Sequence, residues 1–387
     1  MPTEILVVAT EASADLHAAR VLEELRKLDP TLGAFGVGGP RLRAAGLVAL
    51  RQAEEMSVMG LAEVVPKIPV ILAILREIAA AAAARRPALA LLVDSPDFNL
   101  RLAERLKRLG VKVVYYVSPS VWAWRRGRVK TIARVVDRML CILPFEEALY
   151  RESGVSARFV GHPLLERASP EPKERYRERL GLAGRTTIAL LPGSRLGELR
   201  RIFPPMLEAA ERIRARHPEV QFVVPVAPTL GEEALRPFLR RHAVLPVALV
   251  ESGTEAALGA SDAALVKSGT AVLETALMRR PMVVVYRLSW LTYFLGRLFV
   301  RLAHFALVNI LAGRSVVPEL LQRQASPLRM AAEIERLLPE GPERAQQLQG
   351  FEEVRARLGS PGAPRRVAEE IAALLARDGM GRAEGVS

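Results

Sequence analysis

The chain has 387 residues, of which 50% are apolar, 25% charged and 5% aromatic; this composition excludes a disordered or fibrous protein and, at roughly 150 residues per domain, predicts two to three domains. Cys141 is the single cysteine, which excludes an intramolecular disulfide and multi-cysteine zinc or iron–sulfur sites. The net charge of +13 indicates either polyanionic partners or an arginine-rich coding bias, and charge alone does not separate the two.

Short β-branched runs alternate with helical segments, a pattern typical of parallel α/β sheets. In the first half we predict strands over 5–10, 88–93, 111–118, 139–143 and 157–160, and helices over 16–28, 100–109, 126–136 and 146–153. In the second half we predict strands over 187–191, 221–226, 247–250, 263–266 and 282–286, followed by helices over 329–338, 342–358 and 364–377.

A polar, proline-containing segment over 161–172 is predicted to link two domains. We expect an N-terminal domain over 1–165, a C-terminal domain over 166–340, and C-terminal helices over 341–387 that fold back onto the first domain. Both domains are expected to be doubly wound α/β sheets that face each other across a cleft. Ligands would then bind beyond the carboxyl ends of the strands.

Neither a membrane-spanning helix nor a signal peptide is expected. No run of about 18 uncharged apolar residues is present, and residues 1–10 carry Glu4 and no basic region, which favours a first strand. The five histidines are scattered without the spacing of metal ligands, so neither a metal nor a cofactor is predicted.

Two segments near the N-terminus border strands. Residues 10–17 join the first strand to its helix, and their small side chains leave room for a ligand beside Glu11, Ser13 and Asp15, although Ser13 or Asp15 could instead cap the helix. GVGG at 36–39 resembles a dinucleotide loop, but its third glycine position is Arg41. A tight turn is therefore the favoured interpretation there.

An acidic segment, DSPDFN at 94–99, follows a buried-looking strand. Pro96 suits the first helical position, so Asp97 would be a first-turn acid that complements the helix dipole. Asp94 remains at the strand end, where a carboxylate can take a proton from an acceptor hydroxyl. Asp94 is the first candidate for a general base and Asp97 the second, with structural roles as the alternative.

Two tryptophans, Trp122 and Trp124, lie beside basic residues over 118–128. Aromatic and basic side chains together can stack nucleic-acid bases, bind a sugar face or bind a phosphorylated headgroup. Packing of one tryptophan in the core is the structural alternative.

Two glycine-containing turns in the second half suit phosphate. Gly193, Ser194 and Arg195 end a strand and begin a helix, where exposed backbone amides attract an anion and a guanidinium can neutralise a diphosphate. The turn at 267–270, with Ser268, Gly269 and Thr270, begins a second helix on which Glu274 can accept hydrogen bonds from ribose hydroxyls. Together they predict a nucleoside-diphosphate site, whereas each alone could be a capped helix with solvated charges.

An apolar segment over 64–75 contains more apolar residues than one buried helix face requires, and Arg76, Arg85 and Arg86 follow it. Such a segment can dock reversibly on an anionic membrane. The predicted contact residues are Val64, Val65, Ile68, Val70, Ile71, Leu72 and Leu75. A core helix of the first domain is the alternative.

These motifs, in order, resemble the lipid-A-disaccharide synthase family of inverting glycosyltransferases, which have two Rossmann-like domains in the GT-B architecture. The matching strings span about 1–325: TEASAD (10–15), GVGGPRL (36–42), MSVMGLAEV (56–64), DSPDFN (94–99), YVSPSVWAWR (116–125), LPFE (143–146), FVGHP (159–163), LPGSR (191–195), SGTAVLE (268–274) and NILAGRSVVPELLQ (309–322). The family usually reads GEASGD at the first string, so Thr10 and Ala14 replace glycines, and Val308 stands where many relatives have proline.

The resemblance implies UDP-2,3-diacylglucosamine as donor, 2,3-diacylglucosamine 1-phosphate as acceptor, and a β-1,6-linked disaccharide 1-phosphate and UDP as products. It places Ser194, Arg195, Gly269, Thr270, Glu274, Asn309 and Arg314 around UDP, and Glu11, Ser13, Asp15 and Asp94 at the acceptor. We also expect Asn99, Trp122 and Trp124 at the acceptor site. A peripheral location on the cytoplasmic face of a Gram-negative inner membrane follows, with no nucleic-acid partner; the oligomeric state, including a homodimer, stays open.

Two other functions compete with this one. A UDP-sugar epimerase would keep the fold and the nucleotide, but a soluble sugar needs no apolar access segment. A non-catalytic protein that binds nucleic acid or acidic membranes would use the positive charge, but acids at strand ends would repel polyanions.

Overall fold

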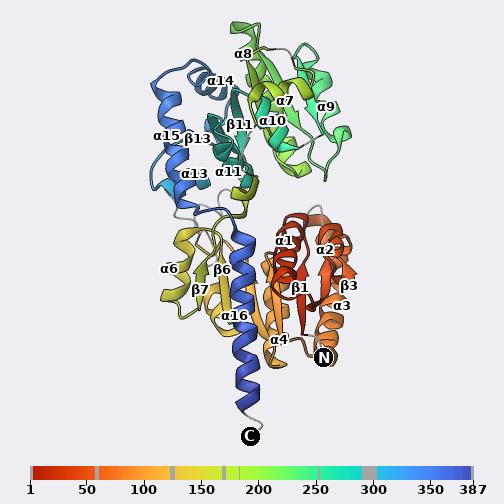
Figure 1. The fold of residues 1–387 in the computed structure, drawn as a ribbon. Helices are drawn as coiled ribbons and strands as arrows, with labels where there is room; N and C mark the ends of the chain where they lie inside the picture. The colour runs from red at the N-terminus through yellow and green to blue at the C-terminus, as the bar shows by residue number, and fades with distance from the viewer. Residues whose placement is uncertain are drawn as a thin grey trace. The chain divides into compact units, whose positions relative to one another are not determined.

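The computed structural model describes residues 3–56, 61–122, 127–167, 171–182, 184–251, 253–289 and 303–384. The chain forms two compact units, one made of Met1–Glu166 with Leu358–Ser387 and the other of Arg167–Arg357 (Figure 1). Each unit contains one parallel sheet, as predicted for doubly wound domains. Within the described ranges, no helix combines the length and apolar character that crossing a bilayer requires.

The first unit has a seven-stranded sheet in the order β3-β2-β1-β4-β5-β6-β7. Its strands are β1 (Glu4–Ala9), β2 (Gly33–Gly38), β3 (Val48–Gln52), β4 (Leu89–Val93), β5 (Lys112–Tyr116), β6 (Arg138–Cys141) and β7 (Ala157–Phe159). Its helices are α1 (Ala12–Leu28), α2 (Pro40–Ala44), α3 (Leu61–Arg85), α4 (Pro96–Arg108), α5 (Arg128–Val135), α6 (Pro144–Glu152) and α16 (Ala363–Glu384).

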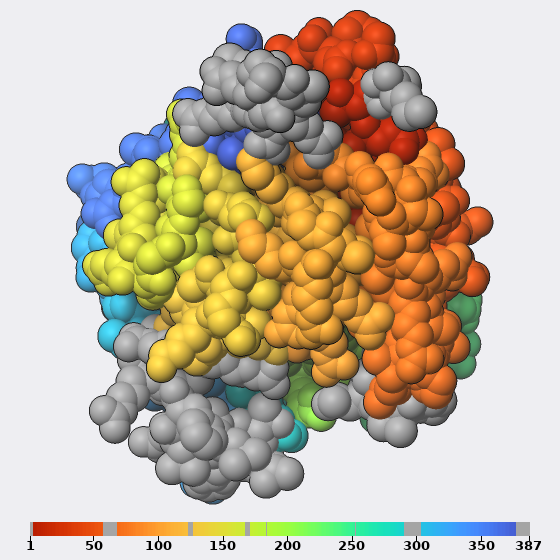
Figure 2. All heavy atoms as spheres, turned by 90° about the horizontal axis from the view of Figure 1, so that it is seen from below, coloured from red at the N-terminus to blue at the C-terminus, as the bar shows by residue number. Residues whose placement is uncertain are grey.

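Helices cover both faces of this sheet. Side chains of α3, α4, α5 and α6 share one core with alternate strand residues, and those of α1, α2 and α16 share another. The C-terminal helix α16 therefore lies beside α1, at the start of the chain (Figure 1). In the space-filling view the orange surface of α3 and α4 borders the yellow surface of the segments that follow them (Figure 2).

The tight turn predicted for GVGG is wrong, because Gly36, Val37 and Gly38 lie in β2. Gly36 has φ of +144°, and a Cβ built there would lie 2.1 Å from the carbonyl oxygen of Val7 on β1. Glycine therefore allows two neighbouring strands to approach closely, which explains the motif without a dinucleotide.

The second unit has a six-stranded sheet in the order β10-β9-β8-β11-β12-β13. Its strands are β8 (Thr187–Leu191), β9 (Gln221–Pro225), β10 (Val247–Val250), β11 (Ala263–Lys267), β12 (Met282–Tyr286) and β13 (Glu319–Leu321). Its helices are α7 (Lys173–Arg179), α8 (Leu196–Arg216), α9 (Arg236–Leu239), α10 (Thr254–Ala260), α11 (Thr270–Leu277), α13 (Leu307–Ala312), α14 (Pro327–Glu335) and α15 (Pro342–Arg357). The short 3₁₀ helix η5 (Gln322–Gln324) follows β13.

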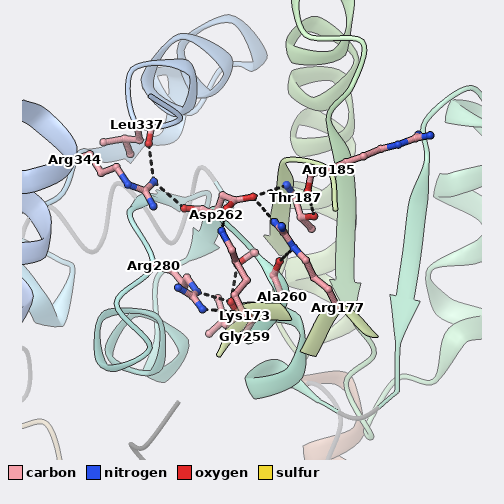
Figure 3. A network of polar contacts seen from close by, with 12 residues as sticks. Lys173, Arg177, Arg185, Thr187, Gly259, Ala260, Asp262, Arg280, Leu337 and Arg344 are labelled. Carbon is pink, nitrogen blue, oxygen red and sulfur yellow. Dashed lines mark hydrogen bonds and ion pairs between the residues drawn. The ribbon is translucent and has the colours of Figure 1, made fainter. Parts of the chain in front are cut away.

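A polar network fixes the amino-terminal edge of this sheet (Figure 3). Asp262, directly before β11, accepts hydrogen bonds from Lys173 at 2.5 Å, Arg177 at 2.6 Å and the amide of Thr187 at 2.8 Å. Burial would raise the pKa of Asp262, but these hydrogen bonds and the positive charges outweigh it and lower that pKa. The network ties α7 to the starts of β8 and β11, at the edge opposite the predicted phosphate turns.

Candidate functional site

The strand order of the first unit reverses between β1 and β4, which are adjacent and paired from Ile5↔Leu89 to Ala9↔Val93. Ligands of open α/β sheets bind at such a reversal, beyond the carboxyl ends of the strands. The loops that leave these two strands begin with Thr10 and Asp94, and a hydrogen bond of 2.7 Å from Thr10 Oγ1 to Ser95 Oγ joins them. The predicted acids Glu11 and Asp94 therefore lie on adjoining loops.

The backbone at this edge is strained. Asp94 and Ser95 have φ of 53° and 45°, and Val117, just after β5, has φ of 65°. Non-glycine residues rarely adopt this region, and a β-branched valine does so at a larger cost. The carbonyl oxygen of Asp94 accepts hydrogen bonds from Asn99 Nδ2 at 2.7 Å and Tyr115 Oη at 2.5 Å, which hold the strained loop in place. Such strain concentrates at functional sites.

The carboxyl group of Asp94 is electrostatically perturbed. Burial raises its pKa from 3.8 to about 6, and the negative charge of Glu11 adds to the rise, while a backbone hydrogen bond from Ser95 opposes it. A carboxylate with this pKa is ionised at neutral pH and is a stronger base than an exposed aspartate. Asp94 thus has the protonation chemistry of a general base.

Asp15 is buried and engaged with the backbone of α2. Its carboxylate accepts hydrogen bonds from the amides of Gly39 at 2.7 Å, Arg41 at 3.0 Å and Leu42 at 3.1 Å. It therefore anchors the GVGGPRL segment on α1, and we assign it to positioning instead of to acceptor contact. Ser13 and Glu11, by contrast, are exposed at the start of α1.

The other acids and amides of DSPDFN take supporting positions. Asp97 is exposed on the first turn of α4 and forms an ion pair with Arg128 of α5. Asn99 is buried and donates hydrogen bonds to the carbonyl oxygens of Val93 and Asp94, so it fixes the backbone at the end of β4. Asp94 remains as the acid of this segment that combines a strand end with a raised pKa.

Trp122 packs edge-on against Phe145, with ring centroids 5.2 Å apart, while Trp124 lies outside the described residues. Phe145 is followed on α6 by Glu146, whose buried carboxyl group was not among the predicted site residues. Burial raises its pKa to about 7, and the hydrogen bond that Glu146 Oε2 accepts from the Leu143 amide at 3.2 Å opposes the rise. Its sequence signal was the acid that ends LPFE (143–146), three residues after the predicted strand over 139–143.

The second unit has the same arrangement at its own reversal, between β8 and β11, which pair from Ala263↔Ile188 to Val266↔Leu191. Gly193 follows β8 with φ of +112°, and Arg195 is the exposed N-cap residue of α8. Ser268 and Gly269 follow β11, and Thr270 begins α11. The structure therefore brings both predicted phosphate turns to neighbouring strand ends.

Glu274 is half-buried one turn into α11. The two residues placed at UDP by resemblance alone have other contacts. Asn309 is fully buried; its Oδ1 accepts from the amides of Val316 and Val317 and its Nδ2 donates to the Val317 carbonyl oxygen. Arg314 forms a 2.7 Å ion pair with Glu353 of α15. Asn309 thus holds the turn before β13, a role that spacing could not reveal.

The apolar segment of the first unit forms part of α3. Ile68 and Val70 are 43% and 48% exposed, Ile71 and Leu72 are half-buried, and Leu75 is 3% exposed within the core. Because a membrane contact must be exposed, Leu75 does not belong to it. The side chains of Val64 and Val65 lie outside the described residues.

A pocket of about 630 Å³ in the second unit lies beside α8, the segment after β12 and η5. Its lining includes Arg200, Arg201, Arg287 and Arg323, with Glu208 as the acid among the lining residues. None of the predicted UDP-binding residues lines it. The pocket is therefore a different feature from the two turns.

The family described as lipid-A-disaccharide synthetase matches residues 5–366 of the chain. The chain is 67% identical over 373 residues to the lipid-A-disaccharide synthase of Anaeromyxobacter dehalogenans (strain 2CP-C), covering 96% of this chain and 97% of that protein. It is 56% identical over 376 residues to the lipid-A-disaccharide synthase of Myxococcus xanthus (strain DK1622), covering 97% and 98%.

Solved structures share the fold at low identity. The UDP-GlcNAc 2-epimerase from Neisseria meningitidis bound to UDP-GlcNAc has a TM-score of 0.66 and 12% identity, covering 96% of this chain and 100% of that one. The calicheamicin glycosyltransferase CalG4 has a TM-score of 0.61 and 16% identity, covering 97% and 99%. These likenesses show a GT-B-like fold, as predicted.

Proposed function

The chain belongs to the lipid-A-disaccharide synthetase family of glycosyltransferases, and we propose that it transfers 2,3-diacylglucosamine from its UDP derivative to 2,3-diacylglucosamine 1-phosphate. The first unit binds the acceptor, with Glu11, Ser13 and Trp122 around it, and the second unit binds the UDP-sugar. The products are a β-1,6-linked disaccharide 1-phosphate and UDP.

The position of Asp94 carries this proposal: a carboxyl with a raised pKa, on strained backbone, at the strand reversal of the first unit. Asp94 accepts the proton of the acceptor 6-hydroxyl as its oxygen attacks the anomeric carbon of the donor. The bond from that carbon to the diphosphate oxygen breaks, and UDP leaves with the electron pair. Attack from the face opposite UDP inverts the anomeric configuration.

The second unit stabilises the leaving group. Negative charge grows on the diphosphate as the bond breaks, and preformed positive charge lowers the energy of that state. Arg195 and the amides at the starts of α8 and α11 supply it from two neighbouring strand ends. Glu274, one turn along α11, binds the ribose hydroxyls.

The acyl chains require access from a bilayer. Ile68 and Val70 present exposed apolar side chains on α3, and Arg76 follows on the same helix. Burial of a few apolar side chains together with cation attraction suffices for reversible docking on anionic lipid. We therefore propose a peripheral position on the cytoplasmic face of the inner membrane.

Asp94→Asn tests the catalytic assignment. We expect turnover, measured as UDP release with both lipids in detergent, to fall by about 100-fold or more because the base is lost. UDP affinity, measured by titration calorimetry, should stay within about twofold of the unaltered enzyme because Asp94 does not contact the nucleotide. The matched control is Asp97→Asn, which we expect to retain most of the activity. Near-normal turnover of Asp94→Asn would remove Asp94 from this role.

An epimerase remains the second candidate, because solved epimerases share the fold. Product analysis separates the two: an isomerised UDP-sugar without disaccharide would favour epimerisation. The family match over residues 5–366 favours the transferase.

A further inference from the structure

Lys267 is the last residue of β11 and the first residue of the predicted phosphate turn at 267–270, in which its side chain was given no role of its own. Its Nζ lies 2.9 Å from Oε1 of Glu198 on the first turn of α8. The two side chains are only 18% and 21% exposed, so the ion pair is largely withdrawn from water. It joins the end of β11 to the start of α8, the helix that follows β8, at the strand reversal of the second unit.

Each member of this pair lies against a glycine of a proposed phosphate turn. A Cβ built on Gly193 would lie 2.5 Å from Glu198 Oε2, so the carboxylate fills the space that this glycine leaves open. A Cβ built on Gly269 would lie 3.5 Å from Lys267 Nζ. The ammonium therefore lies over one turn and the carboxylate over the other.

Tyr286, at the end of β12, bounds the same space. Lys267 Nζ lies 5.7 Å from the centre of its ring. The pKa of Tyr286 is raised by burial and by the negative charge of Glu198, and the positive charge of Arg195 opposes that rise. Glu198 and Lys267 thus lie next to both turns and to Tyr286, and the charge of Arg195 acts on the same tyrosine.

A carboxylate that lies on a glycine turn, at a helix start and beside a lysine has the surroundings of a bound anion. We propose that Lys267 is a ligand of the donor's diphosphate, and that Glu198 occupies the anion's place until the donor arrives. This inference rests on the proposed function and adds a residue to its leaving-group site. When the donor binds, Lys267 leaves the Glu198 carboxylate and binds phosphate oxygens. When UDP leaves, the ion pair between Lys267 and Glu198 forms again.

Exchange of this kind predicts opposite effects for the two partners. Lys267→Met removes a cation from the diphosphate and leaves the Glu198 charge next to it, so UDP affinity should fall by about tenfold or more. Glu198→Gln removes the competing anion, so UDP affinity should rise by about threefold or more. A merely structural ion pair predicts that both substitutions weaken UDP binding, because both loosen the two loops.

The experiment is titration calorimetry of the full chain with UDP and, as a second probe, with uridine. We expect Lys267→Met to weaken UDP binding while uridine binding stays within about twofold, because uridine has no diphosphate. Lys267→Arg, which keeps the charge, should retain most of the UDP affinity. Equal losses for UDP and uridine, or weaker UDP binding in Glu198→Gln, would overturn the inference.

Lys173→Met is the matched control. Lys173 forms a 2.5 Å ion pair with Asp262 at the opposite edge of the same sheet (Figure 3), and Arg177 still pairs with Asp262 when it is lost. This variant should unfold at a lower temperature yet bind UDP as the unaltered enzyme does. If Lys173→Met lost as much UDP affinity as Lys267→Met, the loss would come from general loosening of the unit, and Lys267 would not be a ligand.

Arg195→Ala separates failure of the inference from failure of the site. If Arg195→Ala weakens UDP binding and Lys267→Met does not, Lys267 is no ligand although the site stands. If neither substitution weakens it, the diphosphate lies elsewhere, and the inference fails together with the proposed site.

Discussion

At the scale of single residues, Asp94 combines two features that oppose folding. Its φ of 53° lies in the left-handed region, which costs an aspartate free energy, although less than it costs most other residues that have a Cβ. Burial and the charge of Glu11 raise its pKa to about 6, so the folded state loses stability as the pH rises from about 4 to about 6. A neutral side chain at this position would give a more stable fold, whereas a general base must be ionised to accept a proton.

Asp94→Asn is therefore predicted to stabilise the first unit. A pKa moved from 3.8 to about 6 corresponds to about 3 kcal/mol. Because the folded pKa is the higher one, this penalty is absent below about pH 4 and complete above about pH 6. Thermal unfolding at pH 8 should show the asparagine variant as the more stable protein, and the difference should close towards pH 4. Lower stability of the variant at pH 8 would contradict the account.

Residue placement shows how far the sequence could lead. Asp94 was identifiable because an acid directly after a buried strand must lie at the carboxyl edge of a sheet. The roles of Asp15 and Asn309 could not be predicted, because folding brings their hydrogen-bond partners to them. The amides that donate to Asp15 lie 24 to 27 residues further along the chain, and those that donate to Asn309 lie 7 to 8 residues further. The turn that begins with Lys267 was predicted, but the ion pair of Lys267 was not, since its partner Glu198 lies on α8, 69 residues earlier in the chain.

At the scale of elements, most strands were predictable and three were not. The sequence of β2, GAFGVG, has three glycines, and β3, VALRQ, is a largely exposed edge strand that ends in polar residues. β13 has three residues. None of them shows the β-branched run or the strict alternation on which strand prediction depends. The other strands were found within two residues at either end, and central ones such as β4 and β8 show continuous apolar runs because both of their faces are buried.

Helix α3 gives a prediction at this scale. Asp substituted at Ile68 and Val70 together should weaken binding to vesicles of phosphatidylglycerol and phosphatidylethanolamine by about tenfold or more, because a charge opposes insertion into the apolar layer. Co-sedimentation measures this binding. The double substitution should leave the core intact, because both side chains are exposed.

Val48→Asp is the control for this prediction. Val48 is 58% exposed on β3 of the same unit, outside α3, so its substitution adds one negative charge to another surface, where the double variant adds two to α3. Equal loss of vesicle binding in this variant would attribute the effect to net charge and remove α3 from the membrane contact.

At the scale of the whole molecule, the chain leaves the first unit at Glu166 and returns to it at Leu358. Helix α16 closes the face of the first sheet beside α1 and contributes Val367, Ala368 and Ile371 to its core. Glu370 on this helix is buried and forms ion pairs with Arg138 at 2.5 Å and with Arg158. Helix α16 thus completes the fold of the first unit.

Glu370→Gln should consequently destabilise the first unit and not the second. Its loss leaves Arg138 without its carboxylate partner, and we expect a cost of about 1–3 kcal/mol. Hydrogen exchange read by mass spectrometry should show faster exchange in α16 and β6, with α8 and α11 unchanged. Uniform acceleration in both units would show that the return helix does not act on the first unit alone.

Both units place their candidate chemistry at the same topological position. The acid lies between β1 and β4 of one sheet, and the cations and amide turns lie between β8 and β11 of the other. Both sheets therefore hold their candidate residues where ligands of open α/β sheets bind.

The most direct measurement is a crystal structure of the chain with UDP. The account predicts that the diphosphate lies against the turns at 193–195 and 268–270, with Lys267 released from Glu198 and bonded to a phosphate oxygen. A diphosphate held elsewhere, for example by Arg200 and Arg287 in the pocket beside η5, with the Lys267–Glu198 ion pair intact, would contradict it.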